Sequence, residues 1–263
     1  MANGIDVSYH QGSIDWQKVK EAGIEFAIIR TGYGISNPNQ IDKKFYENIE
    51  GAKKAGIDVG VYHYSYASSA LDASKEAKFC LDIIKGEQLT YPIVYDIEDD
   101  SISKLSKQEK TDMCKAFCDR IEMSGYYAMI YCNCNWLNNH LYAHELLPKY
   151  DLWLAQWGAQ SPSVNCGMWQ LSDSGQIPGI KGNVDLNVSY KDYPSIIKSK
   201  GLNGYIPLEE ASESPAHLIH VVIQGDTLTS ISKKYGVPIT DIVRINNIKN
   251  PDLIYVGQEI KIK

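Results

Sequence analysis

Several features of other protein classes are missing from this chain of 263 residues. Basic residues do not exceed acidic ones, since 26 Lys and Arg stand against 32 Asp and Glu, so the chain lacks the basic footprint of nucleic-acid binders. No apolar run approaches the ~18 to 20 residues that a membrane span needs. The opening residues, Met-Ala-Asn-Gly-Ile-Asp, contain neither the cationic nor the apolar segment of a signal peptide. We therefore expect no nucleic-acid partner, no membrane partner and no Sec-type export.

Motifs for phosphate and metal binding are also missing. No Gly-x-Gly-x-x-Gly follows a predicted strand and no Walker-type loop occurs, which argues against an open nucleotide-binding sheet. The six cysteines form no Cys-x-x-Cys pair, although a zinc site built from Cys114, Cys118, Cys132 and Cys134 is geometrically feasible. Structural zinc usually takes its ligands from tight knuckles, so we expect reduced, mostly buried thiols and neither a metal nor another cofactor.

Phenylalanine is scarce and tyrosine is abundant. The chain holds 4 Phe, 18 Tyr and 5 Trp, so most of its aromatic rings carry a polar group. Such rings suit surfaces that are apolar on one side and wet on the other, including platforms on which sugars stack. Because Tyr is also common in ordinary strands, the count only supports other arguments.

The composition changes once, near residue 200. Residues 201–217 are rich in Gly, Pro, Ser and Glu and have no helical or alternating periodicity, which indicates an exposed linker. All five Trp precede it, and the charge changes sign across it: 19 basic and 25 acidic residues in 1–198, six and four in 218–263. We expect a domain at 1–198, a linker at 199–217 and a second domain at 218–263.

Short β-type runs alternate with helical patterns in the first domain. The runs lie at 4–8, 26–31, 59–64, 92–98, 127–132, 152–156, 168–171 and 184–186. Helical patterns lie at 16–22, 42–55, 70–85 and 106–124. Eight strands with helices between them predict an α/β fold, an irregular (β/α) barrel of the TIM type with an incomplete set of helices, over the alternative of an open doubly wound sheet.

Acidic residues stand at the ends of several predicted strands. In an α/β barrel the chemistry lies at the carboxyl ends of the strands, where this sequence has Asp6, Asp96, Glu98 and Asp185. Asp96 and Glu98 are two residues apart, so they point to the same side of a strand while Ile97 points to the other. An acid after a strand is often only a helix cap, but several like charges at one barrel mouth indicate acid–base chemistry or, as a further alternative, a metal-dependent hydrolase.

These strand ends belong to a longer pattern. It comprises Gly-Ile-Asp-Val-Ser at 4–8, Gln-Gly-Ser-Ile-Asp-Trp at 11–16, Phe-Ala-Ile-Ile-Arg at 26–30, Gly-Val-Tyr-His-Tyr at 60–64, Asp-Ile-Glu at 96–98, Leu-Trp-Leu-Ala-Gln-Trp at 152–157, Met-Trp-Gln at 168–170 and Val-Asp-Leu-Asn at 184–187. In this order the segments resemble glycoside hydrolase family 25, the muramidases of phage endolysins and bacterial autolysins. The resemblance runs through most of residues 2–193 and implies an incomplete, flattened barrel.

The resemblance also implies roles for the four acids. Glu98 matches the family's general acid/base, and Asp6, Asp96 and Asp185 match its other active-site acids. The family is usually discussed as retaining configuration through the N-acetyl group of the substrate, with Asp96 orienting that group, although inverting and direct-nucleophile routes have been argued. On this basis protonated Glu98 gives a proton to the leaving oxygen and then deprotonates the incoming water.

Aromatic and amide side chains near the strand ends are candidates to bind sugar. We expect this role for Tyr62, Tyr64, Tyr131, Trp153, Gln156 and Trp157, with core packing as the alternative for each ring. Gln170 is a further candidate to form a hydrogen bond with sugar.

The C-terminal segment has the pattern strand, helix, helix, strand. The string Val-Val-Ile-Gln-Gly-Asp-Thr-Leu-Thr-Ser-Ile-Ser-Lys-Lys-Tyr-Gly-Val begins at residue 221, and the segment resembles the LysM domain over its full length. That family is a small α+β fold that binds glycans containing N-acetylglucosamine. The resemblance implies a glycan groove at Gly225, Asp226, Thr227, Leu228, Asp252, Leu253, Ile254 and Tyr255, although Asp226 and Thr227 can also act as helix caps.

Together these patterns predict a peptidoglycan N-acetylmuramidase, or lysozyme, with a wall-binding tail and glycan strands as its partner. A wall- or chitin-binding protein without hydrolytic activity is the alternative, and a chitinase or glucosaminidase is a third reading. Without a signal peptide, we expect synthesis in a bacterial host cytosol and action at the cell wall after holin-type release or lysis. The sequence does not determine the oligomeric state.

Overall fold

The computed structural model describes residues 1–207 and 218–262. The chain divides into two compact units, with the boundary after Pro207. The predicted linker at 199–217 falls partly outside the described residues, since 208–217 are not among them. Each unit is considered by itself below.

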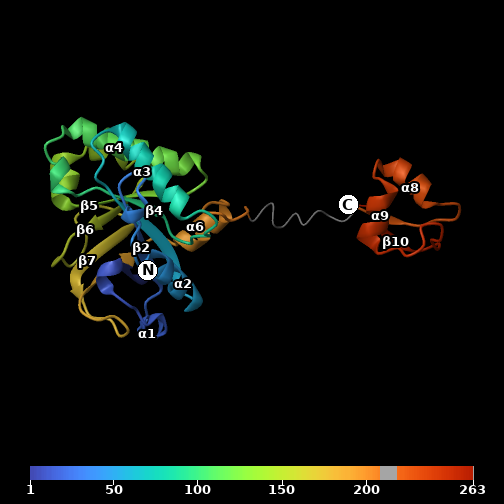
Figure 1. The fold of residues 1–263 in the computed structure, drawn as a ribbon, viewed down its shortest axis with the longest axis horizontal. Coiled ribbons are helices and arrows are strands. Elements are labelled where there is room, and N and C mark those ends of the chain that lie inside the picture. Colours follow the sequence, from blue (N-terminus) through green and yellow to red (C-terminus); the bar gives the residue numbers. More distant parts are fainter. Residues whose placement is uncertain (208–217, 263) are drawn as a thin grey trace. The chain divides into compact units, whose positions relative to one another are not determined.

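The first unit is a closed barrel of eight strands (Figure 1). The strands are β1 (Ala2–Val7), β2 (Phe26–Tyr33), β3 (Asp58–Tyr64), β4 (Ile93–Asp96), β5 (Ala128–Asn133), β6 (Asp151–Ala155), β7 (Met168–Gly175) and β8 (Val184–Ser189). Neighbours from β1 to β7 are parallel, whereas β8 runs antiparallel to both β7 and β1. The predicted barrel is therefore confirmed, and the open sheet is wrong.

Helices cover the first half of the barrel much better than the second. They are α1 (Trp16–Glu21), α2 (Phe45–Lys54), α3 (Ala70–Ile83), α4 (Lys107–Met123), the short α5 (Ala143–Leu146) and α6 (Tyr193–Ser199). Within the described range 151–189, no helix follows β6 or β7, so the predicted incompleteness of the helix set is confirmed. Side-chain caps begin several helices, for example Ser69 before α3 and Ser106 before α4. The longest helix, α4, has 17 residues, and no described helix is both long and apolar enough to cross a bilayer.

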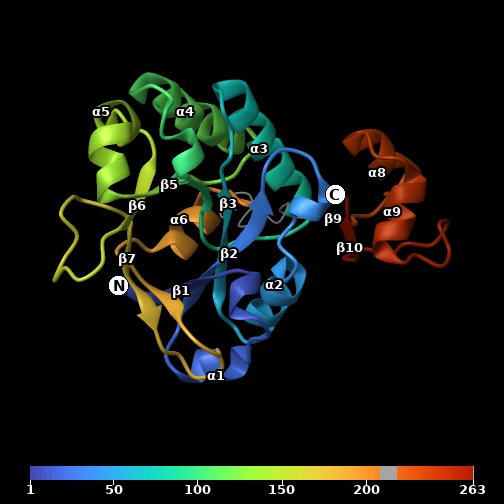
Figure 2. The same ribbon diagram turned by 60° about the vertical axis from the view of Figure 1, so that its left-hand side comes forward.

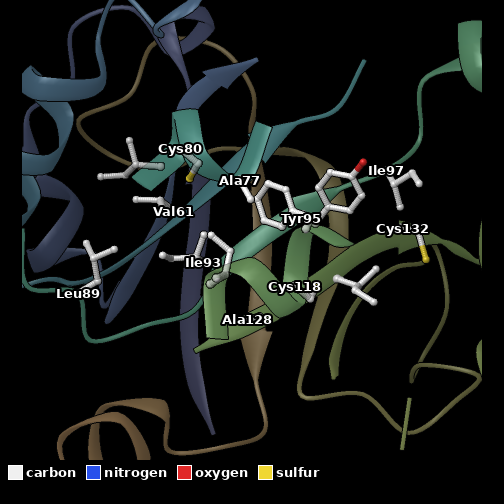
Figure 3. Packing of buried hydrophobic residues seen from close by; sticks show 14 of the residues in the cluster. Val61, Ala77, Cys80, Leu89, Ile93, Tyr95, Ile97, Cys118, Ala128 and Cys132 are labelled. Atoms are coloured by element: carbon white, nitrogen blue, oxygen red, sulfur yellow. The ribbon is translucent and has the colours of Figure 1, made fainter. Parts of the chain in front are cut away.

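Strand residues alternate between two apolar layers. Outward-facing side chains pack under α3 and α4, which lie side by side in Figures 1 and 2. Figure 3 shows part of this layer, with Tyr95 of β4 among Ala77 of α3 and Cys118 of α4. Inward-facing side chains such as Val94 and Met129 fill the barrel. Because side chains alternate along a strand, the residue two positions after an inward-facing residue also points inward. At the carboxyl end of a strand, that residue lies at the mouth of the barrel.

The amino-end opening of the barrel is closed by α6 and the residues after it. Tyr193 and Ile197 of α6 are fully buried in the inner cluster. Asn203 is also fully buried, and its side-chain amide donates to the carbonyl of Tyr91 at 2.9 Å and accepts from the N–H of Tyr127 at 2.7 Å. Residues 200–207, which the sequence analysis assigned to an exposed linker, thus belong to the barrel unit, because they satisfy backbone groups at its base.

The second unit has the predicted β-α-α-β order. It consists of β9 (Ile219–Val221), α8 (Leu228–Tyr235), α9 (Ile239–Asn246) and β10 (Glu259–Lys261), with the two strands antiparallel. Thr227 caps α8, which ends at Gly236 in the left-handed conformation that glycine adopts without strain. The buried core of the second unit comprises Val222, Leu228, Ile231, Ile242, Ile260 and Ile262.

Candidate active site

Four carboxyl groups meet at the carboxyl-end mouth of the barrel. Asp96 ends β4 on the inward side, two residues after Val94, and Glu98 follows it. Asp6 of β1 lies directly opposite Asp185 of β8 in the antiparallel register. The charges of Glu98 and Asp6 both act on Asp96, and that of Asp185 acts on Glu98. The barrel therefore brings together all four acids that the sequence pointed to.

Burial keeps protons in this cluster near neutral pH. Burial, followed by the negative charge of Asp185, raises the pKa of Glu98 to about 7. Burial and the nearby Asp6 raise the pKa of Asp185 to about 8. The pKa of Asp96 lies well above its ordinary value, because this side chain is buried and faces the charges of Glu98 and Asp6. Close acids with raised pKa values can hold the proton that a general acid must supply.

One oxygen of Asp96 lacks a partner. Asp96 is 5% exposed, and among the described residues its Oδ1 atom makes no hydrogen bond. The guanidinium of Arg30, held by Asp42 at 2.7 Å, is the cation that favours the charged form of Asp96. Ile97 between the two acids is buried in the outer layer, which confirms that Asp96 and Glu98 point to the other side. A buried acceptor without a partner is costly unless a ligand donates to it.

Asp6 is held by two side-chain amides, one from β7 and one from β8. Nε2 of Gln170 donates to Oδ2 of Asp6 at 2.9 Å, and Nδ2 of Asn187 donates to the same oxygen at 2.8 Å. The sugar-binding role suggested for Gln170 is therefore wrong, because its amide is 3% exposed and is used inside the protein. Asn187 was not predicted in this role, because only the register of β8 against β1 brings it to Asp6.

A pocket of about 400 Å³ opens beside Glu98. Its lining residues are Glu98, Tyr131, Asn133, Cys134, Asn135, Ala155, Gln156 and Trp157. Trp157 is 54% exposed, so the face of its ring is open to a ligand. Gln156 lines the pocket while its Oε1 atom accepts from the N–H of Ser163 at 2.8 Å. An aromatic wall next to an acid that holds a proton is an arrangement suited to a sugar ring.

The other aromatic candidates differ in their access to solvent. Trp153 is only 2% exposed, packs against Tyr62 and Tyr131, and donates its indole N–H to Asn187 at 2.8 Å. It lies beneath the mouth, and its predicted stacking on sugar is wrong because no face of its ring is free. Tyr62 is half-buried above it, and Tyr64 is half-buried with its hydroxyl donating to Asp99 at 3.0 Å.

Two exposed tyrosines next to this cluster were not predicted. Tyr66 is 49% exposed and contacts both Tyr64, at 5.2 Å between ring centroids, and Tyr33, at 5.6 Å. Its backbone N–H is anchored by the buried carboxyl group of Glu76 at 2.8 Å. The alternation of Tyr62 and Tyr64 continues to Tyr66 and could have indicated this ring. No sequence pattern indicated Tyr33, because its neighbour Tyr66 follows a different strand.

The predicted glycan groove of the second unit consists of two loops with mixed exposure. Leu253 and Tyr255 are 50% and 63% exposed, and Gly225, Thr227 and Asp252 are exposed, with Ile254 half-buried. Leu228 is 3% exposed and lies in the core, so its prediction as a glycan contact is wrong. The Oδ2 atom of Asp226 accepts from the backbone N–H of Ile223 at 2.9 Å and contacts Nε2 of His220 at 2.7 Å, which stabilises the first loop.

No group of three His, Cys, Asp or Glu side chains within 1–207 and 218–262 is arranged to hold a metal ion. All six cysteines are free thiols, and Cys114, Cys118 and Cys132 are fully buried in the outer layer of the barrel. Burial raises the pKa values of these three thiols well above the ordinary value, which disfavours the thiolate that zinc binds.

Comparison with protein families decides the affiliation of the barrel. The model of glycosyl hydrolases family 25 matches residues 5–180, which include three of the four acids. The chain belongs to this family. The model of the LysM domain matches residues 220–263, in agreement with the β-α-α-β order of the second unit.

Several relatives of this family-25 chain carry names from wall hydrolysis. The autolytic lysozyme of Clostridium acetobutylicum is 31% identical over 189 residues, covering 70% of this chain and 54% of that protein. A bacterial lysozyme structure from Streptomyces coelicolor has a TM-score of 0.65 at 28% identity, covering 78% of this chain and 98% of its own. The modular autolysin LytC of Streptococcus pneumoniae, solved with a synthetic peptidoglycan ligand, has a TM-score of 0.64 at 29% identity, covering 72% of this chain and 46% of its own.

The similarity covers only part of the length of two curated lysozymes. The matched region spans 54% of the autolytic lysozyme of Clostridium acetobutylicum and 66% of lysozyme M1 of Streptomyces globisporus.

Proposed function

We propose that the chain is a peptidoglycan N-acetylmuramidase that hydrolyses the β-1,4 bond between N-acetylmuramic acid and N-acetylglucosamine. The observation that carries this proposal is the cluster of four acids at the barrel mouth, with Glu98 beside an open aromatic pocket. The names of the family-25 relatives support the same reaction. Cleavage of glycan strands requires a proton donor for the leaving oxygen and a group that stabilises a positively charged sugar.

In the proposed mechanism Glu98 is the general acid and then the general base. Protonated Glu98 donates its proton to the glycosidic oxygen as the bond to the anomeric carbon breaks. The acetamido oxygen of the muramic acid closes on the anomeric carbon, which gives an oxazolinium ion and leaves the second sugar as an alcohol. Glu98, now a carboxylate, takes a proton from the incoming water. The water oxygen bonds to the anomeric carbon, which opens the oxazolinium ring and restores the acetamido group.

Asp96 is proposed to orient the acetamido group. Its Oδ1 atom, buried and without a partner, is an acceptor suited to the acetamido N–H. The positive charge of the oxazolinium ion favours the ionised form of Asp96, and Arg30 acts in the same direction. The Asp6–Asp185 pair contributes further negative charge at the mouth. We propose sugar contacts for Tyr64, Gln156 and Trp157, and for Tyr62 and Tyr131 at the bottom of the site.

A direct test of the activity uses purified Gram-positive cell wall. The released fragments are reduced with borohydride and analysed by mass spectrometry. Reduced muramic acid ends identify a muramidase. Reduced glucosamine ends would identify a glucosaminidase and contradict the proposal. Wall binding without any fragments would favour the alternative of a binding protein without hydrolytic activity.

The pH profile provides a second test. A general acid works in its protonated form, and the pKa of Glu98 is raised to about 7 by burial and neighbouring charge. We therefore expect kcat/KM on soluble glycan strands to fall as the pH rises through about 7. The charge of the exposed Asp100 helps to raise the pKa of Glu98, so Asp100→Asn should move this alkaline limb to lower pH. A shift to higher pH would contradict the assignment of the limb to Glu98.

The proposed division of labour assigns hydrolysis to the barrel and wall binding to the LysM unit. The exposed Leu253 and Tyr255 on one loop, and Gly225 and Thr227 on the other, are proposed to contact N-acetylglucosamine. Asp226 and Ile254 are proposed to support these loops and Asp252 to flank them. Tethering a weak binding module to an enzyme raises the local concentration of substrate without changing the chemistry.

Truncation after Pro207 tests this division. The fragment 1–207 keeps Asn203, which bonds to the backbone of Tyr91 and Tyr127 at the base of the barrel. We expect it to retain the kcat of the full chain on soluble glycan strands while sedimenting with insoluble wall at least tenfold less. A fragment ending at residue 200 should unfold at a lower temperature, since it loses these bonds. Equal loss of binding and hydrolysis by fragment 1–207 would refute the division.

Action at the cell wall fits both units. We further propose that the chain is made in a bacterial host cytosol and reaches the wall by holin-type release or by lysis. The six free thiols support synthesis in a reducing compartment.

A further inference from the structure

Gln170 of β7 and Asn187 of β8 hold Asp6 through a closed set of hydrogen bonds. Both amides donate to the Oδ2 atom of Asp6, at 2.9 Å and 2.8 Å. They are register partners on adjacent strands and are 3% and 2% exposed, so water does not compete for these bonds. Hydrogen bonds to a charged acceptor are among the stronger ones, and a low local dielectric strengthens them further.

Aromatic donors determine which way each amide points. The indole N–H of Trp157 and the hydroxyl of Tyr131 both donate to Oε1 of Gln170, each at 3.1 Å. The indole N–H of Trp153 donates to Oδ1 of Asn187 at 2.8 Å. An indole N–H can only donate, so it requires the amide oxygen on its side and turns the NH₂ group towards Asp6.

The two amide donors distinguish Asp6 from its partner Asp185. The two carboxyl groups lie opposite each other and share a hydrogen bond, so they do not ionise independently. Burial opposes the charged form of Asp6, whereas the hydrogen bonds from Asn187 and Gln170 favour it. The titratable groups that face Asp6 from the surrounding strands are Asp185, Glu98, Asp96, Tyr62 and Tyr131.

We propose that Gln170 and Asn187 are positioning residues that keep the negative charge of the Asp6–Asp185 pair on Asp6, and that Gln170 couples this charge to Trp157 in the sugar pocket. This inference rests on the proposed muramidase function. A fixed negative charge at the barrel mouth stabilises the sugar as it becomes positive in the transition state. A sugar ring that packs on Trp157 presses on the same amide that holds Asp6, so pocket occupancy and the orientation of the charge are linked.

The first variant is Gln170→Met in the full chain, which keeps the length of the side chain and removes both the donor and the acceptor. We expect kcat on soluble glycan strands to fall about 10- to 100-fold, since a misplaced group near the reacting atoms costs rates of that order. Asp6 loses a donor that favours its charged form, so the acid limb of the pH profile should move to higher pH. A folded variant whose acid limb does not move would overturn the proposal.

Two further variants separate positioning from packing. Gln170→Glu can, when its new carboxyl group is protonated, donate to Asp6 and accept from Trp157, so at pH 5 it should restore most of the lost kcat. Failure of this rescue in a folded protein counts against the proposal. Gln176→Met, an exposed position in the same hairpin beyond β7, is the matched control and should keep the wild-type profile.

Trp157→Phe tests the coupling at an exposed position where folding is not at risk. It retains an aromatic face for the sugar but lacks the N–H that fixes Gln170. A lower kcat and a raised acid limb with unchanged KM would support the coupling. A raised KM with unchanged kcat and unchanged acid limb would show that the ring only stacks, and would overturn it.

A readout independent of hydrolysis keeps this inference separate from the proposed function. The carboxyl ¹³C resonances of Asp-labelled protein report the titration of Asp6 and Asp185 directly. In Gln170→Met the titration midpoint of Asp6 should rise relative to the wild type. If the wild type releases no muramic acid ends from wall but this midpoint rises, the proposed function fails and the positioning role stands. An unchanged midpoint overturns the positioning role whatever the activity.

Discussion

Glu98→Gln is expected to lower kcat on glycan strands by about 10³-fold, which is within the range that general acid–base catalysis contributes. The amide has nearly the same shape as the carboxyl group but cannot donate its proton to the leaving oxygen or accept one from water. Release of reducing ends from soluble strands, followed at pH 5.5, measures the effect. Sedimentation with insoluble wall should be unchanged, because the LysM unit is untouched.

The same substitution should leave the fold intact or stabilise it. The pKa of Glu98 is raised to about 7, so the ionised form is disfavoured in the folded protein and stability is lost as pH rises through that value. Glu98→Gln should therefore raise the melting temperature at pH 8 and change it little at pH 4. Glu122→Gln on the exposed end of α4 is the matched control and should keep full activity. Near-wild-type activity of a folded Glu98→Gln variant would exclude Glu98 as the general acid.

Asp96→Asn is expected to reduce kcat on N-acetylated strands by about 10²- to 10³-fold, a loss comparable with that of one preorganised stabilising group. The Oδ1 atom of Asp96 is buried without a partner and is proposed to accept the acetamido N–H. An asparagine at this position cannot carry the negative charge that stabilises the oxazolinium ion. Its kcat, compared with the wild type on the same soluble strands, measures the first effect.

A comparison of two substrates distinguishes a role of Asp96 in orienting the acetamido group from a general effect of its charge. The wild type should cleave N-acetylated strands much faster than chemically de-N-acetylated ones, and Asp96→Asn should bring the ratio of these rates towards one. An unchanged ratio in a less active variant would assign Asp96 a role other than orienting the acetamido group. Asp112→Asn, on the exposed side of α4, neutralises a surface carboxylate and should change neither rate nor ratio.

The order of strands and the positions of the four acids followed from the sequence because these features depend on local spacing. Alternation of apolar residues located all eight strands, and the spacing of Asp96 and Glu98 placed them on one side. The strand-helix order, together with the lack of helical patterns after 106–124, predicted the incomplete barrel. Such patterns are determined by neighbouring residues and require no knowledge of distant contacts.

Burial and hydrogen-bond partners were decided by the tertiary structure. Trp153 and Leu228 fit the patterns of binding residues, but closure of the barrel and of the LysM core leaves them no exposed surface. Asn203 stands in a stretch with linker composition, yet its side-chain amide satisfies backbone groups 76 and 112 residues away. Composition does not record such distant partners.

The environment of Asp6 illustrates the same limit within the site. The spacing of apolar residues in the sequence predicted that an acid ends the first strand, and the family pattern indicated that it belongs to the site. Only the antiparallel return of β8 sets Asp6 opposite Asp185 and brings Asn187 to its oxygen, 181 residues away in the chain. The charge that a carboxyl group carries depends on the donors and charges around it, and those are assembled only when the barrel closes.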